Sequence, residues 1–510
     1  MTVTLDGTTL TIDDVVRVAR GLEEVRVDDK VLDRLAACRR GIDALVDSDV
    51  PVYGVSTGFG SLATTYIAPN DRAGLQRSLL RSHAAGAGGE VEDEVVRAMM
   101  LCRLRTLCTG VTGVRASTAQ AYADLLNARI TPVVLEFGSL GCSGDLAPLA
   151  HVGLALTGEG DVRNAQGERM AAADALRDAG LQPVQLAEKE GLALINGTDG
   201  MLGMLLLAVR DAEELLRIAD VTASLSIQSL RGTDRVFRDD LQRLRPQVGQ
   251  QLSAANLLRL MADSPIVADH LDDTSQVQDA YSLRCAPQVH GAARDTIEHA
   301  RRVASLELQS AIDNPVVLSD GSLASTGNFH GAPLGYVLDF VAIALADVAS
   351  MAERRSDRLL DPARSYGLPP FLAHRPGVDS GLMIAHYTQA GLVSEMKRLA
   401  VPASVDSIPT SAMQEDHVSM GWHAARKLRM SIAALRTVLA IELMAGSRAL
   451  ALRAPLLGSP PSNALVRALE ELGLGPGPDR PLAAEIATAD AFLLDGSWWR
   501  AIEPLVEQLN

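Results

Sequence analysis

The strongest constraint on the fold of this chain is a set of long apolar stretches, rich in Leu and Ala, that carry charges at helical spacing. They cover residues 201–230, 291–312, 333–360 and 411–452 of the 510-residue sequence. Helices of about 20 to 40 residues, at about 1.5 Å per residue, span roughly 30 to 60 Å and must bury their apolar stripes against one another. We therefore expect a mainly α fold, an elongated helical bundle whose apolar faces continue across subunits.

The composition supports closely packed helices. Aromatic residues make up only 3% of the chain, so Ala, Leu and Val must build most of the core, which disfavours a β-sandwich. The hydrophobic share of 47% and the charged share of 22% are those of folded proteins. Sixty-three acidic against 47 basic residues leave a formal charge of −16, which repels nucleic acid and anionic membranes. We expect neither as a partner.

The first 200 residues have a more mixed pattern. Val3, Leu5 and Leu10 flank Asp6-Gly7, which predicts a small hairpin. Thr11 and Asp14 predict the start of a helix. Helical patterns then alternate with glycine-rich stretches that are candidate site loops; the helical patterns cover residues 72–83, 92–109 and 115–129, and the glycine-rich stretches cover 54–60 and 138–144.

We accordingly predict two parts, a smaller mixed region over residues 1–200 and a long-helix bundle over residues 201–510. Residues 459–461 and 473–481 are rich in Pro and Gly, which predicts a connection to a short helical segment at the C-terminus.

Several features favour the cytoplasm. The N-terminus lacks the basic and apolar segments of a signal peptide. The longest apolar runs, residues 201–209 and 333–346, are shorter than the roughly 18 uninterrupted residues that a bilayer requires. The five cysteines form no C-x-x-C pair, so neither a disulfide framework nor a zinc site is indicated.

Three common site motifs are excluded. Residues 54–60 and 86–89 are rich in glycine but lack the Gly-Lys-Ser/Thr ending of a phosphate-binding loop. The stretch Gly141-Cys142-Ser143-Gly144 resembles a nucleophile elbow, but its second glycine comes one position early. The ten histidines are scattered and form no H-E-x-x-H pattern, so we expect no metal site.

The most informative segment covers residues 138–149, where small residues surround Ser143. The absence of a Cβ lets the backbone nitrogen of Gly144 approach the carbonyl carbon of Cys142. Dehydration, including loss of the Ser143 hydroxyl, would leave an exocyclic alkene on a five-membered ring. Such a ring is a carbon electrophile that no ordinary side chain provides.

This segment resembles the signature of the histidine and aromatic amino-acid ammonia-lyase family. The prosthetic group of that family, 4-methylidene-imidazol-5-one (MIO), forms autocatalytically from an internal Ala-Ser-Gly. Here Cys142 takes the Ala position and contributes its backbone to the ring. The resemblance extends over about residues 50–455 and includes further site blocks at residues 53–60, 196–198, 278–284, 327–331 and 414–417. It implies the lyase and fumarase-like bundle fold, with MIO formed from Cys142-Ser143-Gly144 and no metal or diffusible cofactor.

The resemblance also implies roles for individual residues. Tyr53 is the candidate general base, although an ordinary phenol titrates near about 10 and needs neighbouring donors or charges to act as one. Arg284 has a planar fork that holds a carboxylate through two hydrogen bonds. The remaining residues complete the site: Asn196, Gln278, Tyr281 and Gln414 as polar groups, Glu415 as a catalytic group, and Phe329 and Met383 as apolar walls.

The pair Ser82-His83 indicates the substrate. Histidine-specific members of the family tend to show Ser-His here, tyrosine-specific ones His-Leu and phenylalanine-specific ones Phe-Leu. An imidazole requires polar partners at both ring nitrogens, because each unpaired one costs about 1 to 3 kcal/mol. His83 and Glu415 would supply them, whereas a buried carboxylate gains nothing beside a phenyl ring. We expect L-histidine as substrate, with trans-urocanate and ammonia as products.

Two alternatives remain open. One is a sister MIO enzyme, either a tyrosine or phenylalanine lyase or an aminomutase that returns the amine to Cβ. The other is a helical scaffold that kept the fold and lost the chemistry. The resemblance further implies a homotetramer whose active sites take residues from three subunits, and it leaves open whether Tyr53 or Glu415 removes the β proton.

Overall fold

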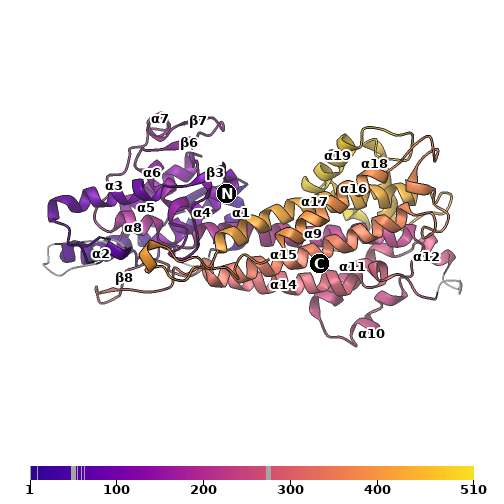
Figure 1. Cartoon of the computed structure of the whole chain (residues 1–510), viewed down its shortest axis with the longest axis horizontal. Coiled ribbons are helices and arrows are strands. Elements are labelled where there is room, and N and C mark those ends of the chain that lie inside the picture. Colours follow the sequence, from indigo (N-terminus) through magenta and orange to yellow (C-terminus); the bar gives the residue numbers. More distant parts are fainter. Residues whose placement is uncertain are drawn as a thin grey trace. The chain divides into compact units, whose positions relative to one another are not determined.

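The computed structural model describes residues 2–7, 10–46, 53, 56–58, 60–62, 64–270 and 277–510. It is mainly α, as expected, and its few strands are short (Figure 1). The chain divides into two compact units. Unit 1 contains Met1–Ala208, Ala300–Asp339 and Pro402–Arg426, and unit 2 contains Val209–His299, Phe340–Val401 and Lys427–Asn510. The predicted division at residue 200 follows a change in sequence pattern and stays a prediction.

The N-terminal hairpin predicted from the sequence is wrong. Strand β1 (Thr2–Leu5) instead pairs in parallel with β2 (Glu24–Val27), and helix α1 (Ile12–Ala19) connects them. The two strands have the same alternating pattern of burial: Val25 and Val27 of β2 are buried, and so are Val3 and Leu5 of β1. Because both sets are buried, the parallel pairing of β1 with β2 is favoured over a local hairpin. The helix start at Thr11 is confirmed, because its hydroxyl accepts a hydrogen bond from Asp14 N at 3.1 Å and the Asp14 carboxylate accepts one from Thr11 N at 2.9 Å.

The rest of unit 1 consists of short helices and small sheets. The helices are α2 (Asp29–Val46), α3 (Arg72–His83), α4 (Asp93–Leu107), α5 (Ala116–Asn127), α6 (Leu146–Leu156), α7 (Ala172–Asp178) and α8 (Glu190–Ile195). The antiparallel pairs are β3 (Ala87–Glu90) with β5 (Leu135–Phe137), β6 (Asp161–Arg163) with both β4 (Thr131–Pro132) and β7 (Arg169–Ala171), and β8 (Val316–Val317) with β9 (Leu323–Ala324). Helices α3, α4 and α5 confirm the three helical patterns predicted before residue 130.

Four long helices contribute residues to both units. They are α9 (Asp199–Ser229), α14 (Ala286–Leu308), α15 (Ala332–Leu360) and α17 (Gly421–Ala451). Hydrogen bonds between their side chains show that the unit 2 segments of these helices lie side by side (Figure 1). The shorter helices of unit 2 are α10 (Asp239–Gln242), α11 (Val248–Met261), α12 (Pro265–Asp269), α13 (Tyr281–Arg284), α16 (Met383–Leu399), α18 (Pro460–Glu471), α19 (Leu482–Leu494) and α20 (Ser497–Ile502).

The helix predicted over residues 411–452 begins only at Gly421. Ser411, Ala412 and Met413 have φ angles of 53°, 52° and 68°, and residues in this left-handed region cannot continue a right-handed helix. The preceding segment therefore forms a loop. Near the C-terminus, the Ser459 hydroxyl caps α18 and prolines follow in its first turn, so residues 459–461 start a helix. Only residues 473–481 form the connection expected there.

Two stretches of the described chain, Glu190–Ser229 and Ala332–Leu360, are long and apolar enough to cross a membrane by length and composition alone. The apolar window of the first is 100% buried inside the protein, and that of the second is 61% buried. Helices that are apolar all round are also typical of the core of a large protein. The burial of these windows is consistent with that interior position.

Unit 1 also contains a fully buried ion pair. Lys189 precedes α8, and its Nζ lies 2.5 Å from Asp313 Oδ2, with both side chains 0% exposed. Burial lowers the pKa of the Lys189 ammonium, and the Asp313 carboxylate opposes this effect. Among the described residues, Lys189 is the cation within ion-pair distance of this carboxylate.

We expect Lys189→Met to lower the free energy of unfolding by about 3 to 5 kcal/mol, because it leaves a buried carboxylate without its cation. The double variant Lys189→Met/Asp313→Leu should lose less. As a control, Arg238→Met removes a pair whose side chains are 59% and 60% exposed, and it should cost about 1 kcal/mol or less. Urea unfolding measures all three, and equal losses in the two single variants would contradict this account.

Candidate active site

The predicted MIO loop lies against the turn before α9. Gly144 has φ +75°, and a Cβ on this residue would lie 2.1 Å from the carbonyl oxygen of Gly197. The next residue, Asp145, donates its backbone N–H to the same oxygen at 2.7 Å. Only glycine fits at position 144, because any side chain would overlap the backbone of the neighbouring turn.

The side chain of Asp145 stabilises the contact between the loop and the turn through further hydrogen bonds. Its Oδ2 accepts hydrogen bonds from Gly200 N and Met201 N, both at 2.9 Å, and its Oδ1 accepts one from Ser139 Oγ at 2.8 Å. Burial raises the pKa of the Asp145 carboxyl to about 7, although these donors oppose the shift. The side chain therefore ties the loop to the N–H groups of the first turn of α9, which lack partners within the helix.

A cavity of about 790 Å³ opens onto this loop in unit 1. Eight of the predicted site residues line it: Tyr53, His83, Cys142, Ser143, Asn196, Phe329, Gln414 and Glu415. Gly144 is buried next to them. The other four, Gln278, Tyr281, Arg284 and Met383, belong to unit 2 and are not among the residues that line the cavity. The cavity of unit 1 therefore brings together part of the predicted set.

Glu415 accepts three hydrogen bonds at the edge of the loop. Ser143 Oγ donates to its Oε1 at 2.9 Å, while Cys142 Sγ and Thr410 Oγ1 donate to its Oε2 at 3.3 and 3.1 Å. Burial, together with the adjacent Glu415 carboxylate, raises the pKa of the Cys142 thiol to about 12. The thiol is therefore protonated and able to donate. Sequence reasoning missed Thr410, because only the left-handed turn after it brings its hydroxyl to Glu415.

Hydrogen bonds orient the side chains of Asn196 and His83 at the cavity. Asn196 Nδ2 donates to the carbonyl oxygen of Ser143 at 2.9 Å. The Nδ1 atom of His83 lies 3.0 Å from the carbonyl oxygen of Leu79, which can only accept, so Nδ1 carries the proton and Nε2 is an acceptor. Burial lowers the pKa of His83, although the Glu415 carboxylate opposes this. The imidazole is therefore neutral near pH 7.

The tyrosine block is described only in part. The Tyr53 hydroxyl accepts a hydrogen bond from Gly60 N at 3.1 Å and lines the cavity. Residues 54, 55 and 59 of the predicted Tyr53–Gly60 loop lie outside the described residues. Sequence reasoning also gave no role to His330 and His417, which line the cavity with their rings stacked 5.5 Å apart. His330 lies in the block at residues 327–331 and His417 in the block at 414–417. Their position in these blocks was the sequence signal that could have identified them as cavity residues.

Arg284 offers an unpaired cation in unit 2. Its guanidinium lies 4.7 Å from the centroid of the Tyr281 ring, and its buried Nε has no hydrogen-bond partner. It forms no ion pair within the part of the chain that the structure describes, although its charge interacts with that of the nearby Asp279 carboxylate. Tyr281 is 70% exposed, Gln278 is exposed, and Met383 is the half-buried first residue of α16. A guanidinium of this kind is free to bind an anionic group.

The described residues contain no group of three or more His, Cys, Asp or Glu side chains arranged to hold a metal ion.

We expect Gly197→Ala to destabilise the protein by about 1 to 3 kcal/mol through overpacking. The new Cβ would lie 2.1 Å from Arg103 Nη1 and 2.4 Å from Asp199 Oδ2, two atoms of a buried ion pair. Gly391→Ala is the matched control, because a Cβ there meets nothing within 4 Å and Ala favours the helix by up to about 1 kcal/mol. Thermal unfolding compares the two variants, and a neutral Gly197→Ala would refute the tight packing of this turn.

Comparison with known proteins gives a consistent result. The sequence model of the aromatic amino acid lyase family matches residues 10–471. Histidine ammonia-lyase of Streptomyces avermitilis is 59% identical over 509 residues, covering 100% of this chain and 99% of the relative. The enzyme of the same name from Streptomyces coelicolor is 57% identical over 510 residues, with 100% of both chains covered.

Solved structures agree. The crystal structure of histidine ammonia-lyase from Trypanosoma cruzi has a TM-score of 0.91 at 38% identity and covers 100% of this chain and 96% of its own. Tyrosine aminomutase from Streptomyces globisporus has a TM-score of 0.94 at 36% identity, with 100% of both chains covered. The fold expected from the sequence is therefore confirmed. The chain belongs to the aromatic amino acid lyase family, which makes it a carbon–nitrogen lyase.

Proposed function

We propose that this chain is a histidine ammonia-lyase, which converts L-histidine to trans-urocanate and ammonia. The observation that carries the proposal is the combination, in one cavity, of the Cys142-Ser143-Gly144 loop with His83 and Glu415. Relatives at 57% and 59% identity over the full chain have the same name.

The loop residues fit the formation of MIO. The left-handed Gly144 packs where no Cβ fits, and Asn196 Nδ2 bonds the Ser143 carbonyl oxygen, which would become the oxygen of the ring. The Ser143 hydroxyl, which must leave as water, is bonded to the Glu415 carboxylate. When present, this group supplies an electrophilic carbon that makes an amine a better leaving group. The remaining steps depend on ordinary side chains.

Two acceptors in the cavity suit an imidazole. His83 Nε2 and the Glu415 carboxylate both accept hydrogen bonds. A neutral imidazole has one ring N–H, which pairs with either acceptor, and an imidazolium has two, which pair with both and orient the ring. A phenyl ring would leave both acceptors without a donor, at a cost of about 1 to 3 kcal/mol each, whereas a phenol hydroxyl could donate to only one of them. These two residues therefore favour L-histidine over the aromatic substrates of sister enzymes.

Arg284 is the proposed partner of the substrate carboxylate. Its free fork can form two hydrogen bonds to a carboxylate, and Tyr281 and Gln278 lie in the same stretch of the chain. Holding the carboxylate and the ring at opposite ends fixes Cα and Cβ between them. Met383 would add an apolar wall, and Tyr53 or Glu415 would accept the β proton.

We further propose a homotetramer in the cytoplasm, with active sites shared among three subunits. The four unit 2 residues do not line the cavity of unit 1, and the Tyr281 side chain is 70% exposed, which suits donation to a neighbouring subunit. All five cysteines are free thiols, which suits a reducing compartment.

We expect Ser143→Ala to lower kcat by at least about a thousandfold, on the order of 4 kcal/mol in activation free energy, because the alkene carbon comes from this side chain. Mass spectrometry of the intact wild-type chain should show two waters fewer than the encoded mass, and the variant should not show this loss. Unchanged turnover in the variant would exclude the use of MIO.

We expect His83→Leu to raise KM for L-histidine by about 5- to 150-fold, because the substrate ring loses a hydrogen-bond partner worth about 1 to 3 kcal/mol. His374→Leu, at an exposed histidine, is the control and should leave KM unchanged. Product analysis accompanies the kinetics. Cinnamate, coumarate or a β-amino acid in place of urocanate would contradict the assigned substrate and reaction.

A further inference from the structure

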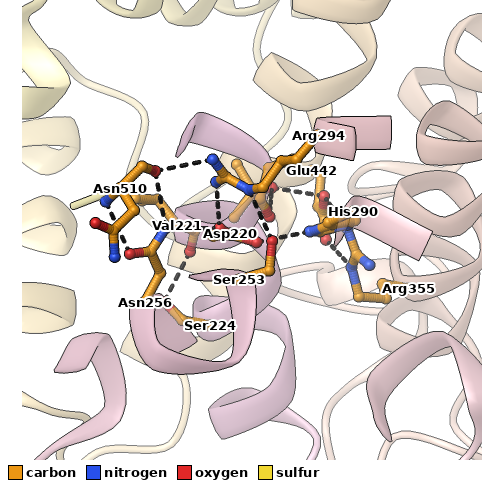
Figure 2. Close-up of polar contacts among 12 residues, drawn as sticks. Asp220, Val221, Ser224, Ser253, Asn256, His290, Arg294, Arg355, Glu442 and Asn510 are labelled. Carbon is orange, nitrogen blue, oxygen red and sulfur yellow. Dashed lines mark hydrogen bonds and ion pairs between the residues drawn. The ribbon is translucent and has the colours of Figure 1, made fainter. Parts of the chain in front are cut away.

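A fully buried ion pair lies in the helical core of unit 2. Arg355 in α15 pairs with Glu442 in α17, with Nε–Oε1 and Nη2–Oε2 distances of 2.5 and 3.1 Å and both side chains 0% exposed (Figure 2). The two hydrogen bonds form the parallel, bidentate arrangement that a guanidinium and a carboxylate favour. This geometry leaves Arg355 little freedom to rotate.

Two hydroxyl groups of α9 complete the hydrogen bonding of the Glu442 carboxylate. Thr222 Oγ1 donates to Glu442 Oε2 at 2.7 Å, and Ser226 Oγ donates to Oε1 at 2.9 Å. Each carboxylate oxygen therefore has one donor from Arg355 and one from α9. A buried polar network whose groups are satisfied in this way is rigid, and it specifies one arrangement of its side chains.

The pair belongs to a larger polar cluster (Figure 2). His290 Nδ1 in α14 bonds Asp220 Oδ1 at 2.8 Å, and Asp220 Oδ2 accepts from Arg294 Nη2 at 2.7 Å and from Asn256 Nδ2 at 2.9 Å. Burial lowers the pKa of His290, although Asp220 opposes this effect. The cluster therefore consists of a neutral imidazole between two ion pairs, and its charges balance.

The third nitrogen of Arg355 points to the proposed substrate-binding segment. Arg355 Nη1 donates to the carbonyl oxygen of Ser282 at 3.3 Å. Ser282 lies in α13, a helix of four residues, and the last carbonyl groups of a helix lack partners within the helix. The buried guanidinium thus fixes the backbone of α13 between Tyr281 and Arg284.

The side chain of Arg284 has no comparable support. Among the described residues, its guanidinium contacts the Tyr281 ring and interacts with the charge of the Asp279 carboxylate, and its buried Nε has no hydrogen-bond partner. Before α13, Asp279 Oδ2 accepts a hydrogen bond from Thr233 N at 2.8 Å. The direction of the free guanidinium therefore depends on how firmly the backbone of α13 is held at these two points.

We propose that Arg355 and Glu442 are positioning residues for the substrate carboxylate. Through the Ser282 carbonyl they hold α13 in the orientation at which Arg284 can form both hydrogen bonds to that carboxylate. The proposal rests on the proposed function, in which Arg284 binds the carboxylate of L-histidine.

The test removes the pair without leaving a buried charge. Arg355→Met/Glu442→Leu replaces both partners by apolar groups of similar size, an exchange that is often neutral for stability, and it deletes the donor to Ser282. Inhibition constants are measured for urocanate, which has an imidazole and a carboxylate, and for histamine, which lacks the carboxylate. We expect the constant for urocanate to rise about tenfold or more, that for histamine to stay within about twofold, and Tm to be retained.

Arg355→Lys is a second variant in case the double variant does not fold. It keeps a cation beside Glu442 but cannot also reach Ser282 with a planar fork, so it should raise the urocanate constant selectively. Arg448→Met/Glu485→Leu is the matched control, because it removes a buried pair that joins α17 to α19. Glu485 also pairs with Arg480, whose side chain is 33% exposed and can be solvated in this variant. Both of its inhibition constants should remain at wild-type values.

Arg284→Met distinguishes a failure of the positioning proposal from a failure of the proposed function. If it leaves the urocanate constant unchanged, the proposed carboxylate partner is wrong. If it raises that constant while the two Arg355 variants do not, the positioning proposal is wrong and the assignment of Arg284 stands. An equal rise for urocanate and histamine in the Arg355 variants would also overturn the positioning proposal, because it would indicate a general loosening of the site.

Discussion

The contact between Gly144 and the backbone of Gly197 is the constraint on which the site depends. A Cβ at residue 144 would lie 2.1 Å from the Gly197 carbonyl oxygen, so the loop reaches this position only with glycine. Asp145 then bonds both the turn and the first N–H groups of α9. A long, well-packed helix thus holds a loop whose own residues would not keep it in one conformation. Ser143 is presented to the cavity as a result.

The same principle applies to the side chains around the loop. Cys142 and Thr410 donate to Glu415 and would still do so once the Ser143 hydroxyl has left, and His83 is oriented by the carbonyl group of Leu79. Each functional group is therefore fixed by a hydrogen bond to a neighbour before a substrate arrives. Preorganisation of this kind reduces the cost of binding and of reaching the transition state. In unit 2 the buried pair of Arg355 and Glu442 would give Arg284 the same support.

Much of the fold and part of the site could be predicted from the sequence. Residues 72–83 form a helix with the predicted bounds because local periodicity decides such a segment. The N-terminal hairpin was wrong because β1 has a distant partner with the same alternation, and local patterns do not reveal pairing at long range. Residues 411–420 looked helical because the left-handed backbone of Ser411, Ala412 and Met413 cannot be read from composition. The contacts of Thr410 and Arg355 depend on tertiary packing, whereas Tyr53, Ser143 and Glu415, which line the cavity, were predicted from family motifs.

The central claim is that residues 142–144 cyclise to form the electrophile. A high-resolution electron-density map of freshly purified, fully active enzyme tests it most directly. The account predicts continuous density for a five-membered ring in which the Gly144 nitrogen is bonded to the former carbonyl carbon of Cys142, with no density for the Ser143 hydroxyl. An open, ordinary peptide at these three residues in active enzyme would contradict it.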